Sequence, residues 1–364
     1  MKAGIVGLPN VGKSTLFNCL SNAKAQSANF PFCTIEPNIG VVNVPDPRLE
    51  KLETLVKPER VVPATVEIVD IAGLVKGASK GEGLGNKFLA NIRETDAILH
   101  VLRCFDNENI VHVDGKINPV RDKETVDFEL QLKDLETVEK KLDKVRRAAN
   151  TGDKLAIKEL AILDKIKKNL ESAVSVRAIE FTAEERREFV SGLQLISDKP
   201  VLYVCNVDEK SAKSGNNYVD QVKEAIKNEN AGILVLAVAT EADITELGDY
   251  EEQKMFLEDM GLDEPGVAKL IRAAYTLLNL QTYFTAGVKE VRAWTIHIGD
   301  TAPIAAGVIH SDFEKGFIRA EVMKYEDFIH FGSELKVREA GKLSVEGKEY
   351  VVQDGDMMNF RFNV

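Results

Sequence analysis

The stretch that decides the fold is residues 7–14, GLPNVGKS, which fits the pattern G-x-x-x-x-G-K-[ST]. A short apolar run over residues 3–8 leads into it and is typical of a buried parallel strand. After the motif, Leu16, Phe17 and Leu20 recur at helical spacing. A strand, a glycine-containing turn and a helix in succession predict the start of a doubly wound α/β domain.

The chemistry that this motif serves is phosphate binding. Its glycines let the backbone wrap around phosphate groups, while backbone N–H groups and the helix N-terminus supply partial positive charge. We expect Lys13 to reach the β- and γ-phosphates of a nucleoside triphosphate, and the Ser14 hydroxyl to bind Mg²⁺. The loop residues expected to bind the nucleotide are Asn10, Val11, Gly12, Lys13, Ser14 and Thr15.

A second motif, DIAG at residues 70–73, supports this interpretation. Asp70 ends an apolar run over residues 66–70, where its carboxylate can orient a water molecule bound to Mg²⁺. The Gly73 amide can then meet the γ-phosphate. The pattern D-x-x-G is weak evidence alone, but it is specific when it follows a phosphate loop and ends a strand.

Two further stretches could complete the site. In the loop FPFCT, residues 30–34, the Thr34 hydroxyl is a candidate to join Ser14 and Asp70 around Mg²⁺; the alternative is an ordinary loop threonine. Residues 74–85 contain four glycines, which suits a segment ordered by the γ-phosphate and released on hydrolysis.

Apolar runs and their spacing predict the domain organisation. Runs that predict a mostly parallel sheet with crossover helices recur at residues 66–70, 97–102, 201–205 and 233–238. Between them, an apolar series that begins at Phe128 and Leu132 predicts a long amphipathic helix. A turn at residues 150–153 and a second such helix make a coiled-coil-like hairpin, and a shorter helix is expected to begin near Thr182 with a capping box to Glu185.

The C-terminal part has a different pattern of predicted elements. Strands are predicted over residues 291–298, 317–323 and 335–338, and a short helix over residues 301–308. These elements indicate a compact α+β module. The predicted domains are a nucleotide-binding domain over residues 1–128 and 197–280, an inserted helical hairpin over residues 129–196, and a C-terminal domain over residues 281–364.

The distribution of charge limits the kinds of partner that the protein is expected to bind. The 364 residues carry 47 basic and 58 acidic side chains, a net charge of −11, which argues against a protein that coats nucleic acid with its whole surface. Residues 139–168 nevertheless contain ten basic and five acidic side chains. One interpretation is a solvated helix surface with i,i+4 ion pairs, and the other is a contact face for RNA or an acidic protein surface.

Composition also indicates a cytoplasmic protein. No signal peptide and no apolar run long enough to span a membrane are recognisable. The four cysteines are far apart in sequence and form no CxxC pair, so reduced and mostly buried thiols are expected rather than a disulfide or metal site.

Taken together, these motifs resemble those of the Obg-like ATPases, the YchF subfamily of translation-factor-related GTPase-like proteins. The resembling stretches are Gly7–Thr15, Asn29–Asn38, Asp70–Gly85, Asn206–Glu209, Asn279–Thr295 and Phe313–Ala320. The resemblance covers nearly the whole chain. It implies an α/β nucleotide domain, an inserted helical hairpin and a C-terminal TGS domain with a β-grasp fold. It also implies cytoplasmic ATP hydrolysis and binding to the ribosome, including the large subunit, through ribosomal RNA, ribosomal proteins or both. Neither DNA nor a membrane is expected as a partner.

One departure from ordinary GTPases concerns the attacking water. Leu74 follows Gly73, where Ras-like proteins place a glutamine that orients this water, and leucine has no hydrogen-bonding group. Phosphoryl transfer depends mostly on positioning and charge stabilisation, so slow hydrolysis is expected unless another group substitutes. The resemblance implies that His112 is that group; the alternative is a polar surface histidine.

A second departure concerns the base. The motif N-K-x-D, which reads guanine, appears here as NVDE, residues 206–209. Glu209 stands in the register of the aspartate and Val207 replaces the lysine. Adenine has no N1–H for such a carboxylate, so we predict a preference for ATP over GTP. Recruitment of Asp208 by a small shift is an open alternative. The backbone around Val207, with Asn206 and Phe105, would then form the adenine pocket.

Asn10 suggests one further ligand. Its place in the phosphate loop resembles that of asparagines that ligate K⁺ in some related GTPases; the alternative is an asparagine that supports the turn. Three functions therefore stand open at this stage. They are a slow ATPase switch on the ribosome, a ribosome-binding nucleotide sensor with little turnover, and a conventional GTPase.

Overall fold

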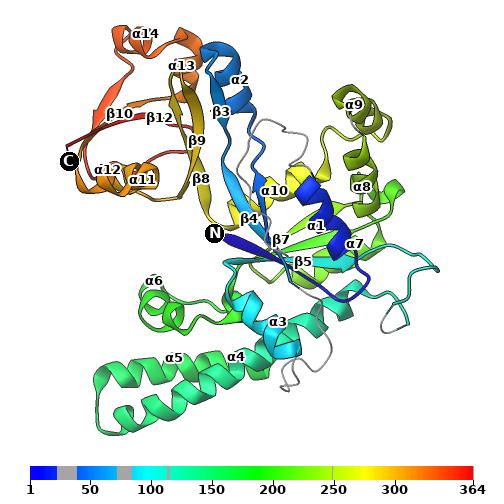
Figure 1. Ribbon diagram of the computed structural model, residues 1–364. Coiled ribbons are helices and arrows are strands. Elements are labelled where there is room, and N and C mark those ends of the chain that lie inside the picture. The colour runs from blue at the N-terminus through cyan, green and yellow to red at the C-terminus, as the bar shows by residue number, and fades with distance from the viewer. Residues whose placement is uncertain (23–38, 72–83, 113–114, 248, 364) are drawn as a thin grey trace. The chain divides into compact units, whose positions relative to one another are not determined.

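The computed structural model describes residues 1–22, 39–71, 84–112, 115–247 and 249–363 (Figure 1). Contacts divide these residues into two compact units. The first takes residues 1–22, 39–40 and 67–270 with the gaps just given, and the second takes residues 41–66 and 271–363. Thr34, Cys33, Gly73 and Leu74 lie outside the described residues.

A six-stranded sheet with the order β2-β4-β1-β5-β6-β7 forms the centre of the α/β fold. Its strands are β1 Lys2–Val6, β2 Ile39–Asn43, β4 Thr65–Asp70, β5 Ala97–Arg103, β6 Val201–Asn206 and β7 Ala231–Leu236. From β4 to β7 all neighbouring strands are parallel, as predicted. Every residue of β5 and β6 is buried, because parallel strands carry helices on both faces. The carboxyl ends of these strands meet at one edge of the sheet.

The helices of the nucleotide-binding part alternate with these strands. They are α1 Lys13–Asn22, α3 Leu84–Arg93, η6 Glu209–Ser211, α7 Asn217–Ile226, α8 Val238–Glu246 and α9 Tyr250–Asp259. A further helix, α10 Gly266–Leu277, crosses from the first unit into the second. The doubly wound α/β architecture expected from the sequence is therefore confirmed.

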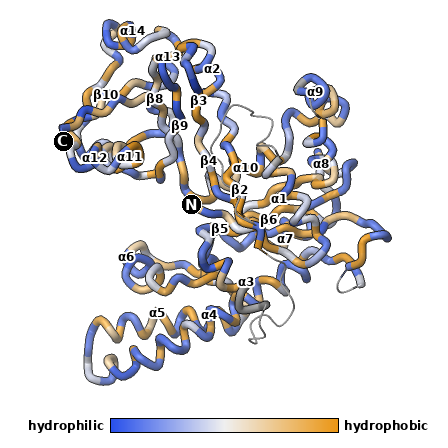
Figure 2. Tube along the Cα trace, viewed as in Figure 1, coloured by the Kyte–Doolittle hydropathy of each residue, from blue (hydrophilic) through white to orange (hydrophobic). Residues whose placement is uncertain are grey.

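The predicted hairpin is formed by α4 Pro119–Asn150 and α5 Lys154–Glu171, which run side by side in Figure 1. The short helical segments that follow are η2 Val176–Ala178, α6 Ala183–Glu185, η3 Arg186–Val190, η4 Ser191–Leu193 and η5 Ile196–Asp198. Figure 2 shows hydrophilic and hydrophobic residues alternating along α4 and α5. Both bonds of the predicted capping box between Thr182 and Glu185 are present.

The first half of α4 differs from the prediction. The helix begins at Pro119, capped by Asn118, and Phe128 is 53% exposed rather than buried. Besides Val126 and Leu130, this half buries polar side chains four or three residues apart, namely Lys123, Asp127, Gln131 and Asp134. Apolar periodicity failed here because these side chains have buried polar partners, as Asp134 shows by accepting hydrogen bonds from two backbone amides. The apolar side chains that α4 contributes to the hairpin core begin with the partly buried Leu135 and continue with the buried Val138, Leu142 and Val145.

The second unit contains a six-stranded mixed sheet with the order β11-β10-β12-β8-β9-β3. Its strands are β3 Arg60–Val62, β8 Leu280–Ala286, β9 Glu290–His297, β10 Phe317–Met323, β11 Ser344–Glu346 and β12 Met357–Phe362. Its helices are α2 Pro47–Val56, α11 Ala302–Ile309, α12 Ser311–Lys315, α13 Tyr325–Phe331 and α14 Glu334–Glu339. The strand predicted over residues 335–338 was wrong, because Ser333 caps a helix there with a bond to the Lys336 amide.

Residues 41–66 belong to this second unit although they lie between the two nucleotide motifs in sequence. Within them, β3 pairs in parallel with β9, which places Arg60 opposite Glu290. The sequence-based division assigned these residues to the nucleotide domain because both flanking motifs belong there. A pairing across some 230 positions leaves no local sequence signal.

The cysteines and the hydropathy of the helices agree with the sequence in the residues that the structure describes. Cys19, Cys104 and Cys205 are buried and free, in agreement with the expected thiols. Across the part of the chain that the structure describes, none of the helices combines the length and apolar character needed to cross a membrane.

Candidate nucleotide-binding site

The phosphate loop joins the end of β1 to the start of α1, and two of its glycines have conformations that need glycine. Gly7 has φ 151° and Gly12 has φ 100°. A Cβ at Gly7 would lie 2.5 Å from the Val101 carbonyl oxygen, and one at Gly12 would lie 2.5 Å from Asn206 Nδ2. Any side chain would therefore push the loop away from the ends of β5 and β6.

Lys13 is buried inside this loop with neutral partners. Its ammonium donates to the carbonyl oxygens of Gly7 at 2.9 Å and Leu8 at 2.7 Å, and it has no ion-pair partner among the residues that the structure describes. Burial lowers the pKa of Lys13 to about 8, although nearby Asp70 opposes the shift. A buried ammonium that is not balanced by a bonded carboxylate is prepared to receive an anion.

Asp70 stands beside the phosphate loop because β4 pairs with β1, in the register Ile5↔Asp70. Burial raises the pKa of its carboxyl, with Lys13 opposing. Its Oδ1 atom is buried and has no hydrogen-bond partner among the described residues. Ser14 is exposed at the N-terminal end of α1. An orphaned carboxylate oxygen at the end of β4 and an exposed hydroxyl at the start of α1 are oxygen ligands of the kind that a hard divalent cation such as Mg²⁺ takes.

Asn206 ties the phosphate loop to the rest of the site. It is buried at the end of β6, and its Nδ2 donates to the Val11 carbonyl at 2.9 Å. Its Oδ1 accepts from the Val238 amide at 3.0 Å, at the start of α8. Both ends of the carboxamide are thus bonded to protein, so Asn206 ties the phosphate loop to the start of α8.

The remaining residues of the base motif lead from β6 into the short helix η6, which Asp208 caps and Glu209 begins. Val207 is buried and its amide donates to the Leu236 carbonyl at 3.0 Å. Glu209 is exposed as the first residue of η6. The Asp208 carboxylate caps this helix through the Ser211 amide at 3.1 Å and the Ser211 hydroxyl at 3.2 Å. Asp208 is therefore engaged in local structure, whereas Glu209 faces solvent.

Phe105 begins the loop after β5, and Arg103 organises that loop. Phe105 is half-buried, with the Arg103 guanidinium 4.8 Å from its ring centre. The fully buried Arg103 donates to the carbonyls of Phe105 at 3.3 Å, Asn107 at 3.0 Å and Ile110 at 2.9 Å. One side chain thus fixes the course of residues 105–110, a role that no motif in the sequence indicated.

His112 follows this loop and is held next to the phosphate loop. The Asn10 amide nitrogen donates to the Val111 carbonyl at 3.1 Å, which joins the two loops. His112 Nε2 lies 2.8 Å from Asp122 Oδ2, and both side chains are buried. The other Asp122 oxygen accepts from Arg121 at 3.2 Å. Asp122 was missed in the sequence because ten residues separate it from His112 and only the fold brings them together.

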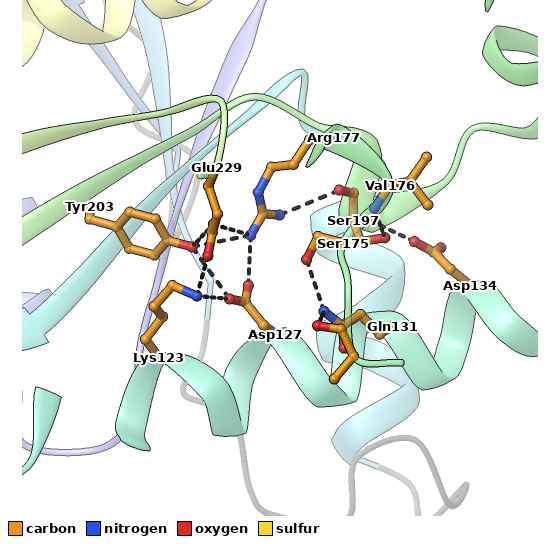
Figure 3. Close-up of polar contacts among 11 residues, drawn as sticks. Lys123, Asp127, Gln131, Asp134, Ser175, Val176, Arg177, Ser197, Tyr203 and Glu229 are labelled. Carbon is orange, nitrogen blue, oxygen red and sulfur yellow. Dashed lines mark hydrogen bonds and ion pairs between the residues drawn. The ribbon is translucent and has the colours of Figure 1, made fainter. Parts of the chain in front are cut away.

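A second group of buried charges joins the base of the hairpin to the sheet (Figure 3). Arg177 Nη2 donates to Asp127 Oδ1 at 2.9 Å and to the Tyr203 hydroxyl at 3.1 Å, and lies 3.4 Å from Glu229 Oε2. Lys123 bridges Asp127 at 2.8 Å and Glu229 at 2.5 Å. These five side chains come from α4, η2, β6 and the segment before β7.

The charges of this group balance one another. Burial alone would raise the pKa of Asp127, but Arg177 and Lys123 outweigh it and lower that pKa to about 2. Burial would likewise lower the pKa of Lys123, yet Asp127 and Glu229 raise it. A buried cluster with every charge paired is a structural joint rather than a ligand site.

Comparison with known proteins identifies relatives along the full length of the chain. Residues 2–141 match a family model described as 50S ribosome-binding GTPase, and residues 280–363 match YchF-GTPase_C, described as a protein of unknown function. The ribosome-binding ATPase YchF of Escherichia coli O157:H7 is 58% identical over 363 residues, which cover 100% of this chain and 99% of the relative. The protein of the same name from Bacillus subtilis is 55% identical over 366 residues, which cover 100% of both. The solved structure of the Schizosaccharomyces pombe YchF GTPase is 40% identical, with a TM-score of 0.89, and the match covers 99% of this chain and 97% of that one.

Proposed function

The chain belongs to the YchF family, and from this premise we propose that it is an ATPase that associates with the ribosome and changes state as it hydrolyses ATP. The observation that carries the proposal is the buried Lys13 ammonium, which is bonded to loop carbonyls, beside the orphaned oxygen of Asp70. A triphosphate would replace the neutral carbonyls around Lys13 with anionic oxygens. The expected gain is electrostatic, because the exchange takes place in a buried environment.

Mg²⁺ is the proposed cofactor, and Ser14, Asp70 and Thr34 are the residues that would hold it. When bound, the metal would supply charge neutralisation on the phosphate oxygens. The support for this assignment is the exposed Ser14 hydroxyl and the raised pKa of Asp70. A K⁺ ion held by Asn10 is a further proposal; it would use the amide oxygen, since the amide nitrogen bonds Val111. Equal hydrolysis rates in Na⁺ and K⁺ would contradict it.

His112 is proposed to orient the attacking water in place of the absent glutamine, with the Gly73 amide at the γ-phosphate. The support is the bond between Asn10 and Val111, which keeps the histidine loop at the phosphate loop, and the Asp122 carboxylate that fixes the ring. We expect single-turnover hydrolysis by His112→Ala to fall about a hundredfold, the lower range for a positioned side chain in proton transfer. A rate equal to that of the wild type would remove His112 from the mechanism and leave the other assignments standing.

ATP is proposed as the preferred nucleotide. Guanine recognition by a carboxylate in the motif would require Asp208 or Glu209, and Asp208 already bonds Ser211. The Val207 amide already donates to the Leu236 carbonyl, so the Val207 carbonyl oxygen and the half-buried Phe105 ring are the groups proposed to meet an adenine ring. Competition calorimetry between ATP and GTP tests this preference, and tighter GTP binding would support the alternative of a conventional GTPase.

The proposed partner is the ribosome, including its large subunit, and the proposed location is the cytoplasm. The support is that the full-length relatives are ribosome-binding ATPases by name and that the N-terminal family model is described as a 50S ribosome-binding GTPase. Co-sedimentation with ribosomes in ATP, ADP and no nucleotide, with hydrolysis followed in the same samples, tests this proposal. Nucleotide-dependent binding with little turnover would favour the nucleotide sensor, and no binding in any state would contradict the association.

A further inference from the structure

The far end of the helical hairpin has an unusual charge for this protein. We define the hairpin tip as residues 143–158, the end of α4, the turn and the start of α5. It contains five basic and two acidic residues, on a chain whose net charge is −11. One of the acidic residues, Asp153, caps α5 by accepting from the Leu155 amide at 2.9 Å. The tip therefore has three more basic than acidic side chains.

Two lysines of the hairpin shaft, outside the tip, form ion pairs with carboxylates of the facing helix. On the shaft, Lys141 pairs with Glu159 at 2.9 Å and Lys167 pairs with Glu139 at 2.7 Å. Arg146, at the boundary, reaches Asp164 only at 3.7 Å. The remaining basic side chains of the tip are exposed and have no ion-pair partner within the described part of the chain; they are Lys144, Arg147, Lys154 and Lys158.

The tip also exposes aliphatic surface. Leu155 is 60% exposed and Ile157 is 50% exposed, while Ala156 between them packs into the hairpin core. From Val138 to Asn150, α4 is part of the hairpin, and a rise of about 1.5 Å per residue places the turn roughly 18 Å beyond Val138. The tip can therefore reach a partner without burying the body of the hairpin.

We propose that the hairpin tip is a contact surface for ribosomal RNA, with its four unpaired cations on phosphate groups and its two aliphatic side chains against the sugar–base surface. The inference rests on the proposed association with the ribosome and names the region and the chemistry of that contact. Charge complementarity selects RNA, because phosphates supply the anions that the tip lacks. On the shaft, Lys141 and Lys167 already have carboxylate partners and are not expected to take part.

The test reverses the four charges in the full-length protein, as Lys144→Glu, Arg147→Glu, Lys154→Glu and Lys158→Glu together. Affinity for ribosomes is measured by co-sedimentation across a range of salt concentrations, and affinity for protein-free ribosomal RNA by filter binding. We expect at least a tenfold loss of affinity in both assays. The slope of log affinity against log salt should become shallower by about 3, since each phosphate contact contributes roughly 0.7–0.9.

A matched control reverses four exposed lysines of the second unit, Lys51, Lys315, Lys342 and Lys348. Unfolding temperature and ATP affinity, measured on both variants, report whether each is folded. The control should bind RNA within about threefold of the wild type. Equal losses in the two variants would show a general charge effect and overturn the assignment of the tip, as would unchanged RNA affinity of the tip variant.

A second variant, Leu155→Ser with Ile157→Ser, separates RNA from protein as the partner. Under the proposal it loses less affinity than the charge reversal and keeps the salt slope of the wild type. Suppose that this serine variant loses ribosome binding while the charge-reversed variant does not, and that it still binds protein-free RNA normally. That result would assign the tip to a ribosomal protein and overturn the proposal. If the wild type failed to bind ribosomes in any nucleotide state, the proposed function would fall, whereas the RNA assay would still decide the role of the tip.

Discussion

Two regions of the first unit bury basic side chains in opposite ways. In the phosphate loop, Lys13 is bonded to carbonyl oxygens, and burial lowers its pKa to about 8. At the hairpin base, Lys123 and Arg177 meet the carboxylates of Asp127 and Glu229, and their pKa values are raised. All three cations are buried, so burial does not distinguish the ligand site from the structural cluster. The presence or absence of a bonded carboxylate does.

The energetic reason lies in desolvation. Moving a charged group out of water costs several kcal/mol of solvation free energy unless bonded groups of opposite charge offset the loss. We therefore expect a buried cation without such a partner only where a ligand supplies the missing negative charge.

The largest expected effect is on the compensated region. Replacing Arg177 with Met leaves Asp127 and Glu229 facing each other with only Lys123 between them. We expect the free energy of unfolding in urea to fall by about 3–5 kcal/mol, as for other broken buried ion pairs. A matched control is Arg186→Met, because the Arg186 side chain is 41% exposed and pairs with Asp198 at 2.9 Å; this variant should lose about 1 kcal/mol or less. Equal losses would mean that burial adds nothing to the cluster.

The next effect concerns the uncompensated cation. Lys13→Ala should slow single-turnover ATP hydrolysis by about 10²–10³-fold, because a preorganised charge at the phosphates is lost. Its unfolding free energy without nucleotide should not fall as that of Arg177→Met does, since Lys13 has no bonded carboxylate to leave unpaired. A Lys13→Ala protein destabilised as strongly as Arg177→Met would place Lys13 among the structural cations.

A third prediction uses His100, the register partner of Val6, whose Nε2 has no hydrogen-bond partner among the described residues. Burial lowers its pKa to about 4 from 6.5, with Asp127 opposing. As the pH falls through this window, the unfolded chain binds a proton that the folded protein does not, so stability falls with falling pH. The loss by pH 5 should be about 2 kcal/mol.

The control for this pH effect is His100→Gln, which has no imidazole to titrate. Its unfolding free energy between pH 7 and pH 5 should change by about 2 kcal/mol less than that of the wild type. If both proteins followed the same pH dependence, the neutral state of His100 would have no bearing on stability.

The smallest effect is expected at Asn206, which ties the phosphate loop to the start of α8. Asn206→Ala removes the bonds to Val11 and Val238, and ATP affinity measured by calorimetry should fall about tenfold, the effect of one or two hydrogen bonds. Asp208→Ala is the neighbouring control, because Asp208 bonds only Ser211 in the described structure. A loss of ATP affinity in the control as large as in Asn206→Ala would return Asp208 to the base site.

The phosphate loop and the hairpin could be predicted from the sequence because their signals are local. The motif over residues 7–14 and the capping box at Thr182 are each complete within a few positions. The ion cluster could not be predicted, since Lys123, Arg177 and Glu229 come from separate elements, and isolated charged residues in a sequence are usually exposed.

The exposed Phe128 and the pairing of β3 with β9 escaped prediction for the same reason. Helical periodicity tells which residues share a face, but it does not tell which face has partners. Long-range pairing then decides, and a single sequence without its fold contains no record of it.

Proton uptake on ATP binding at pH 8 is the most direct test of whether Lys13 is an unbalanced cation in the free protein. Because burial lowers the pKa of Lys13 to about 8, its ammonium is about half deprotonated at this pH in the free protein. Phosphate oxygens should restore its charge. Calorimetry with ATP and Mg²⁺ in buffers of different ionisation enthalpy should therefore report uptake of roughly half a proton per ATP in the wild type and none in Lys13→Met. Tight ATP binding without proton uptake would contradict the unbalanced state of Lys13, and no binding of ATP or GTP with Mg²⁺ in excess would contradict the nucleotide site itself.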